Sequence, residues 1–79
     1  MNRLGSTKEN AIIITIEDHK AGVDAEYEYL ESVYGPMGKA WDFKSQAVYP
    51  GGEGPSYDVI TIDFYEGSSL ATWFDITAF

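Results

Sequence analysis

The stretch YDVITIDFYEGSSLATWFDITAF, residues 57–79, determines the predicted arrangement of the sheet. Both halves alternate apolar and polar residues, as half-buried strands do, and the polar residues 66–69 predict a turn between them. If the connecting loop has an odd number of residues, the apolar positions of both strands share one face. These positions are Ile60, Ile62, Phe64, Leu70, Phe74, Ile76 and Ala78. We therefore predict a hairpin with one apolar face, which a helix can cover.

The opposite face of this hairpin is predicted to mix aromatic and polar residues. Aromatic side chains among polar ones are typical of the surfaces that bind other proteins. A face that is simply solvated is the alternative, because antiparallel sheets commonly leave one face in water. The predicted partner-binding residues are Thr61, Asp63, Tyr65, Trp73 and Asp75.

Residues 19–34 have the pattern of an amphipathic helix. At about 100° per residue, one face carries apolar and tyrosine side chains, namely Val23, Tyr27, Leu30 and Tyr34. The other face carries the carboxylates Asp24, Glu28 and Glu31. Asp18 is placed to cap the start of the helix, and Gly35 followed by Pro36 ends it. We read the carboxylates as the solvated side of a packed helix.

Glu26 is the residue that breaks this separation of faces, because it projects into the apolar arc. An unpaired buried carboxylate is costly. Either its stem covers apolar surface while the carboxylate reaches water, or it finds a polar partner. His19 lies seven residues earlier on the same face, so a buried polar pair of His19 and Glu26 is a predicted candidate site.

The remaining segments complete an α+β fold. Residues 11–17, AIIITIE, predict a short central strand that is buried on both sides. Residues 39–49 alternate with period two and predict another strand, and the glycine- and proline-rich residues 50–56 predict a loop. In the strand, Trp41, Phe43, Ala47 and Tyr49 are expected on one side, and Asp42, Lys44 and Gln46 on the other.

The order of elements is therefore β-α-β-β-β, with one helix packed on one face of a four-stranded, mainly antiparallel sheet. Residues 1–9 are polar and predict a flexible N-terminal arm. Residues 10–79 are predicted to form a single small α+β domain.

The composition excludes several kinds of partner. The 79 residues carry a formal net charge of −8, and all five basic residues precede residue 45. This charge repels nucleic-acid backbones and anionic lipids, so we expect no direct nucleic-acid contact and no membrane contact. The first ten residues lack the apolar stretch of a secretion signal, and the chain has no cysteine. Both features favour a cytoplasmic location.

The sequence offers little for catalysis or for holding a cofactor. It has one histidine, no cysteine and no serine-nucleophile motif. Glu17, Asp18 and His19 are metal-ligand types, but neighbouring residues at a strand end point in divergent directions. The glycine-rich residues 51–54 lack the lysine of a phosphate loop. We therefore predict no cofactor, no metal site and no enzymatic activity.

Three functions remain open. The preferred one is a non-catalytic protein that binds a protein partner, or a second copy of itself as a homodimer, through the open sheet face. In size and charge alone, the chain also resembles acidic proteins that imitate nucleic acid and inhibit nucleases of the restriction or CRISPR type. That function requires carboxylates gathered on one surface. A small-ligand binder or an enzyme would instead require a deep pocket with converging polar groups.

Overall fold

The computed structural model describes residues 3–52 and 54–78, and for His19 the backbone alone. The elements follow one another as η1 (Lys8–Asn10), β1 (Ile12–Ile13), α1 (His19–Tyr34), β2 (Trp41–Tyr49), β3 (Tyr57–Phe64) and β4 (Ser69–Asp75). The four strands form one sheet in the order β1-β4-β3-β2. Both β2–β3 and β3–β4 are antiparallel, and β1–β4 is parallel. The predicted α+β fold with a mainly antiparallel sheet is confirmed.

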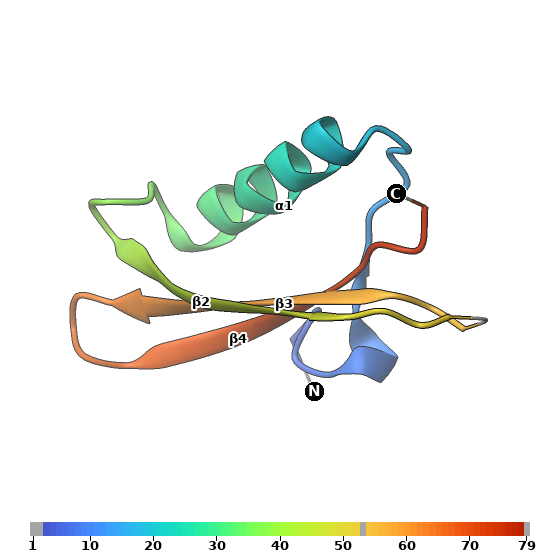
Figure 1. The fold of residues 1–79 in the computed structure, drawn as a ribbon. Helices are drawn as coiled ribbons and strands as arrows, with labels where there is room; N and C mark the ends of the chain where they lie inside the picture. Colours follow the sequence, from blue (N-terminus) through green and yellow to red (C-terminus); the bar gives the residue numbers. More distant parts are fainter. Residues whose placement is uncertain (1–2, 53, 79) are drawn as a thin grey trace.

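The helix covers one face of the sheet, which we call the helix side, and the segment before β1 lies on the opposite, far side (Figure 1). The Asp18 carboxylate accepts a hydrogen bond from the N–H of Ala21 at 2.9 Å and so caps the first turn. The last turn ends at Gly35, whose φ of 96° favours glycine. The predicted bounds of the helix are therefore confirmed.

The β3–β4 hairpin has the predicted odd loop. The Phe64 N–H donates to the Ser68 carbonyl at 2.8 Å, which leaves residues 65–67 as the loop. Ile62 pairs with Leu70 in this register, so the apolar positions of both strands face α1. The buried core between the helix and the sheet is Ile14, Leu30, Trp41, Ile60, Ile62, Phe74 and Ile76.

The predicted facing of β2 is wrong after Phe43, because the strand contains a bulge. Phe43 pairs with Ile62 and Ser45 pairs with Thr61, so Lys44 is an extra residue without a counterpart on β3. From Ser45 onward each side chain therefore lies on the face opposite to the predicted one. Gln46 and Val48 lie on the helix side, and Ala47 and Tyr49 on the far side.

The bulged residue, Lys44, lies near a pair of facing carboxylates. Asp42 pairs with Asp63 across the two strands, and like charges directly opposite each other are destabilising. The Lys44 ammonium lies 3.7 Å from an Asp63 carboxylate oxygen and 3.4 Å from the Ser69 hydroxyl. The extra residue thus brings a positive charge to one of the two facing carboxylates.

The first strand is not central, contrary to the prediction. β1 pairs through two residues with β4 alone and forms one edge of the sheet, and Ile13 is 69% exposed. An isoleucine run signals that side chains are buried, but it does not fix where a strand lies in the sheet. Here the run is divided, with Ile14 entering the core and Ile13 facing solvent.

The segment before β1 extends along the same edge. The Trp73 N–H donates to the Gly5 carbonyl at 2.7 Å, and the Arg3 guanidinium donates to the Ala71 carbonyl. This edge of β4 is therefore covered beyond the two residues of β1. The flexibility of residues 1–9 stays a prediction, and residues 1 and 2 lie outside the described part.

Candidate functional site

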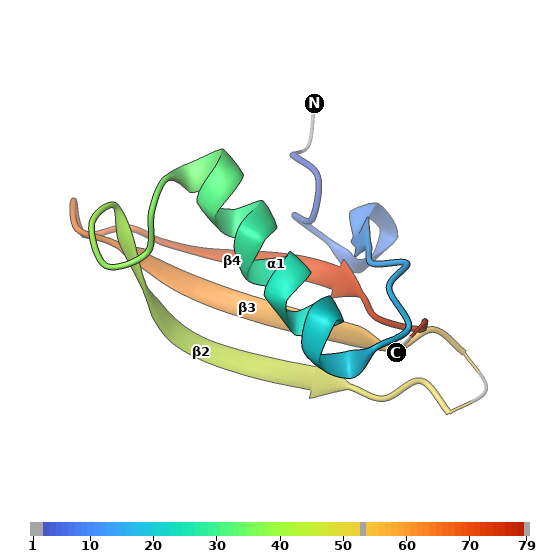
Figure 2. The ribbon, with the colours of Figure 1, turned by 90° about the horizontal axis from the view of Figure 1, so that it is seen from above.

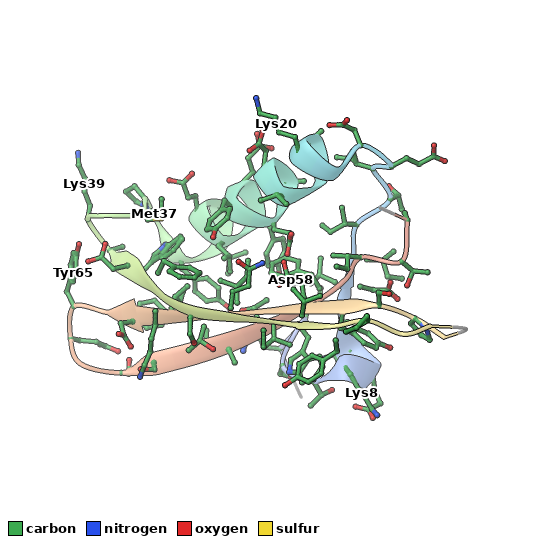
Figure 3. The ribbon with its side chains drawn as sticks, in the orientation of Figure 1. Lys8, Lys20, Met37, Lys39, Asp58 and Tyr65 are labelled. Atoms are coloured by element: carbon green, nitrogen blue, oxygen red, sulfur yellow. The ribbon has the colours of Figure 1, made fainter. Side chains whose placement is uncertain are left out.

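Four of the five residues predicted to bind a partner share the far side of the sheet. Thr61 and Asp63 lie on this face of β3 opposite Ala71 and Ser69. Trp73 and Asp75 lie on the same face of β4, opposite Val59 and Tyr57. Tyr65 belongs to the hairpin loop instead (Figure 3). Trp73 pairs with Val59, six residues before Tyr65, so roughly 20 Å of strand separates the two aromatic residues. They do not form one patch, and partner binding by the five residues stays a prediction.

Trp73 belongs to an aromatic cluster that residue alternation alone did not reveal. Its ring stacks on Tyr49 with centroids 5.3 Å apart, and Tyr57 meets it edge-on at 5.8 Å. The bulge in β2 is what moves Tyr49 to this side. Trp73 is partly buried by these contacts, so the far side is less open than expected.

The most accessible part of the sheet is the β2 edge. Seen from above, α1 runs diagonally over β4 and β3 and leaves most of β2 uncovered (Figure 2). After the bulge, Val48 is 57% exposed, and Tyr49 is also exposed. The five residues Ser45–Tyr49 carry no charge, although the whole chain carries −8. Charges are a common protection of sheet edges against pairing with another chain.

The backbone of β2 also offers hydrogen-bonding groups to solvent. The Phe64 N–H faces β4, and in an antiparallel ladder the direction alternates along each strand. The strand register carries this alternation from β3 to β2. It directs the backbone N–H and C=O groups of Gln46 and Val48 away from β3. Those of Ala47 point toward β3.

A second feature lies on the helix side, where Glu26 meets β3. Glu26 is 0% exposed and Asp58 is 2% exposed. Asp58 lies between the sheet and α1 (Figure 3). The Gln46 side-chain amide donates to both Asp58 carboxylate oxygens at 2.8 Å. No described group donates to either oxygen of Glu26. The prediction that Glu26 enters the apolar arc is confirmed, and its carboxyl group does not reach water.

The neighbourhood of Glu26 changes its protonation. Burial, followed by the adjacent Asp58 carboxyl group, raises the pKa of Glu26 to about 9. Burial also raises the pKa of Tyr27, with smaller contributions from Glu26 and Asp58. Asp58 was not predicted as the partner because nothing in its local sequence marks its distance from the helix. The predicted His19–Glu26 pair stays a prediction, since the His19 side chain lies outside the described residues.

Tyr65 shows a smaller electrostatic effect at the exposed end of the sheet. Its hydroxyl lies near the Asp42 carboxylate, which raises the pKa of Tyr65. The side chain is 58% exposed, so this is a surface contact and not a buried site.

An open surface groove lies at the end of the sheet that holds β1. Its lining is mostly apolar and includes Ile13, Ile14, Pro55 and Ala78, with Glu17 and Asp75 as its carboxylates. Within residues 3–52 and 54–78, no three described histidine, aspartate or glutamate side chains are grouped to hold a metal ion. In the same part of the chain, no helix has both the length and the apolar composition needed to cross a membrane.

Comparisons of the chain with protein-family models, with curated proteins and with solved structures find no match. The proposed function therefore depends on the geometry of the β2 edge.

Proposed function

We propose that the protein acts by contact and not by catalysis, that the free edge of β2 is its contact surface, and that a second copy of the chain is the occupant. The observation that carries this proposal is the difference between the two sheet edges. The β1–β4 edge is covered by residues 3–10, whereas Ser45–Tyr49 is exposed and uncharged, and no described strand pairs with its outer side. Such an edge is a template for adding a strand.

The five residues Ser45–Tyr49, which we call the window, are suited to pairing with the same residues of a second copy. Antiparallel pairing about a two-fold axis at Ala47 places Gln46 opposite Val48 of the second copy. These are the residues whose backbone groups point outward, so each such pair can exchange two hydrogen bonds. Ala47 then faces its own copy in the close, non-hydrogen-bonded position, where a small side chain fits.

The ends of the window match as well. In this register the bulge at Lys44 lies opposite Pro50 of the second copy. Proline has no N–H to donate, and a bulge interrupts the ladder of hydrogen bonds. Regular pairing between the two copies therefore stops at these two residues. The two four-stranded sheets would join into one continuous sheet. An interface of this length is small, so we expect dissociation in the micromolar to millimolar range.

The distribution of carboxylates supports this proposal over imitation of nucleic acid. Within the described part of the chain, the exposed carboxylates do not gather on one surface but lie on η1, on the outer face of α1, on β2 and in the β3–β4 loop. Examples in that order are Glu9, Asp24 with Glu28 and Glu31, Asp42, and Glu66. The groove near β1 is open to solvent, whereas small-ligand sites enclose most of the ligand surface, so it gives little support to a small-ligand site.

Sedimentation measurements across protein concentrations of about 1–500 µM test the proposal. We expect a reversible dimer that strengthens with added NaCl, because salt screens the repulsion between two copies of charge −8. Val48→Lys should abolish the dimer by placing a charge in the window. The matched control is Ile13→Lys, which makes the same kind of change at an exposed aliphatic residue on the other edge.

The Gln46 and Val48 amides provide a second measurement on the unaltered chain. Their hydrogen exchange should slow as the protein concentration rises, because pairing protects outward-facing N–H groups. A monomer at every concentration would overturn the proposal. So would a dimer that Ile13→Lys disrupts and Val48→Lys does not.

A further inference from the structure

Glu26 and Asp58 come from two elements and are both buried, with the Asp58 carboxyl group within hydrogen-bonding reach of Glu26. Glu26 lies in the first half of α1, and Asp58 is the second residue of β3. Each Asp58 carboxylate oxygen accepts a hydrogen bond from Gln46, which marks Asp58 as the accepting carboxylate. Glu26 receives none from a described group. Two carboxylates have no donor between them, so one proton is needed for them to bond to each other.

A proton fits this position better than a metal ion does. Calcium takes six to eight oxygen ligands, and magnesium keeps several waters. The described residues supply two carboxyl groups here and no third acidic or histidine ligand. The surrounding core is apolar and includes Leu30 and Ile60, which disfavours two adjacent negative charges.

We propose that Glu26 and Asp58 share one proton and form a pH-sensitive latch between α1 and the β2–β3 hairpin. With the proton present, the Glu26 O–H donates to the Asp58 carboxylate and joins the helix to β3. Gln46 extends the connection to β2. Loss of the proton leaves two buried charges that repel each other, and the first half of α1 separates from the sheet. This inference does not rest on self-association through β2.

The charged surroundings of the latch are simple among the described residues. From β3, Asp58 acts on Glu26, and on the same helix the partly buried Tyr27 hydroxyl lies in the field of both carboxyl groups. From β2, the facing group is the neutral amide of Gln46. From β4, the buried polar residue is the neutral Thr72. No described basic side chain offsets the charge of the pair.

Carbon NMR of the side-chain carboxyl groups between pH 5 and pH 10 tests for the shared proton directly. We expect the Glu26 carboxyl carbon to titrate within this range, well above the value of 4.5 for the free side chain. Amide exchange in the first half of α1 should quicken over the same pH interval, after correction for the intrinsic effect of pH. A Glu26 carboxyl carbon that does not titrate between pH 5 and pH 10 would overturn the proposal.

Urea unfolding of two variants separates the latch from general charge effects. Glu26→Gln keeps the shape and donates an amide N–H to Asp58, and Glu28→Gln removes the same charge at the surface. Between pH 6 and pH 9 the urea midpoint of the unaltered chain and of Glu28→Gln should fall roughly twofold, while that of Glu26→Gln changes little. Equal falls for both variants would overturn the latch. A Glu26 titration that shifts with added CaCl2 would show a cation site instead.

Discussion

Glu26 links the protonation of one carboxyl group to the free energy of unfolding. Its pKa is about 9 in the folded chain against 4.5 for the free side chain. Below pH 4.5 both states hold the proton, and the full stability is present. Between these two values the folded state holds a proton that the unfolded state has released. Stability therefore falls as the pH rises, and the fall stops above about pH 9.

We expect the free energy of unfolding to fall by up to about 1.4 kcal/mol for each pH unit across this interval. Urea denaturation at intervals of one pH unit measures the slope. In Glu26→Gln the steep part of the slope should disappear, and the remaining slope reports the other carboxylates. A flat profile for the unaltered chain would show that Glu26 is already ionised in the fold.

At the scale of the elements, Gly5 decides whether the segment before β1 can lie against β4. Its φ is +81°, and a Cβ atom built on it would lie 2.7 Å from Thr72 Cγ2 and 2.9 Å from Ile12 Cδ1. The space for this contact exists because residue 5 has no side chain. Gly5 is also the residue whose carbonyl accepts the Trp73 N–H.

Gly5→Ala should therefore release this segment and expose the β4 edge. Gly38→Ala is the matched control, since Gly38 has a φ of +84° and no atom within 4 Å of a built Cβ. Backbone strain of about 1–2 kcal/mol is common to both variants. We expect Gly5→Ala to lose about 1–3 kcal/mol more in urea unfolding, from steric overlap and the lost hydrogen bond. Equal losses would mean that the contact with β4 adds no stability.

At the scale of the whole molecule, self-repulsion is the main electrostatic effect. The chain has thirteen acidic residues and five basic ones. Among the described side chains, the ion pair within 4.0 Å is that of Lys44 with Asp63, and it is about half exposed. Such pairs contribute little, whereas excess charge of one sign destabilises a compact state.

Raising NaCl from about 20 mM to 500 mM should therefore raise the thermal midpoint by about 3–8 °C, because the Debye length shrinks from roughly 20 Å to a few ångströms. Circular dichroism at low protein concentration measures the midpoint for the monomer. Val48→Lys, which is designed to be monomeric, is the control that separates screening from dimer formation. A midpoint that falls with salt would indicate that attractive pairs outweigh the repulsion.

Much of the fold follows from local sequence. The bounds of α1 follow from Asp18, Gly35 and Pro36, because capping and the lack of a proline N–H act within a few residues. The face that β3 and β4 turn toward the helix follows from alternation and from the parity of one short loop. Glu26 could be placed inside the apolar arc by the helical period alone.

Tertiary structure alone decided the features on which the two proposals rest. The bulge at Lys44 depends on pairing with β3, so no alternation within β2 could reveal that Gln46 faces Asp58. The edge position of β1 depends on which other strands pair with β4. The partner of Glu26 comes from a strand 32 residues later in the chain. Local sequence determines periodicity and helix ends, because these arise from neighbouring residues. Contacts between distant segments depend on the register of the whole sheet, and here that register places two carboxyl groups together and leaves one edge free.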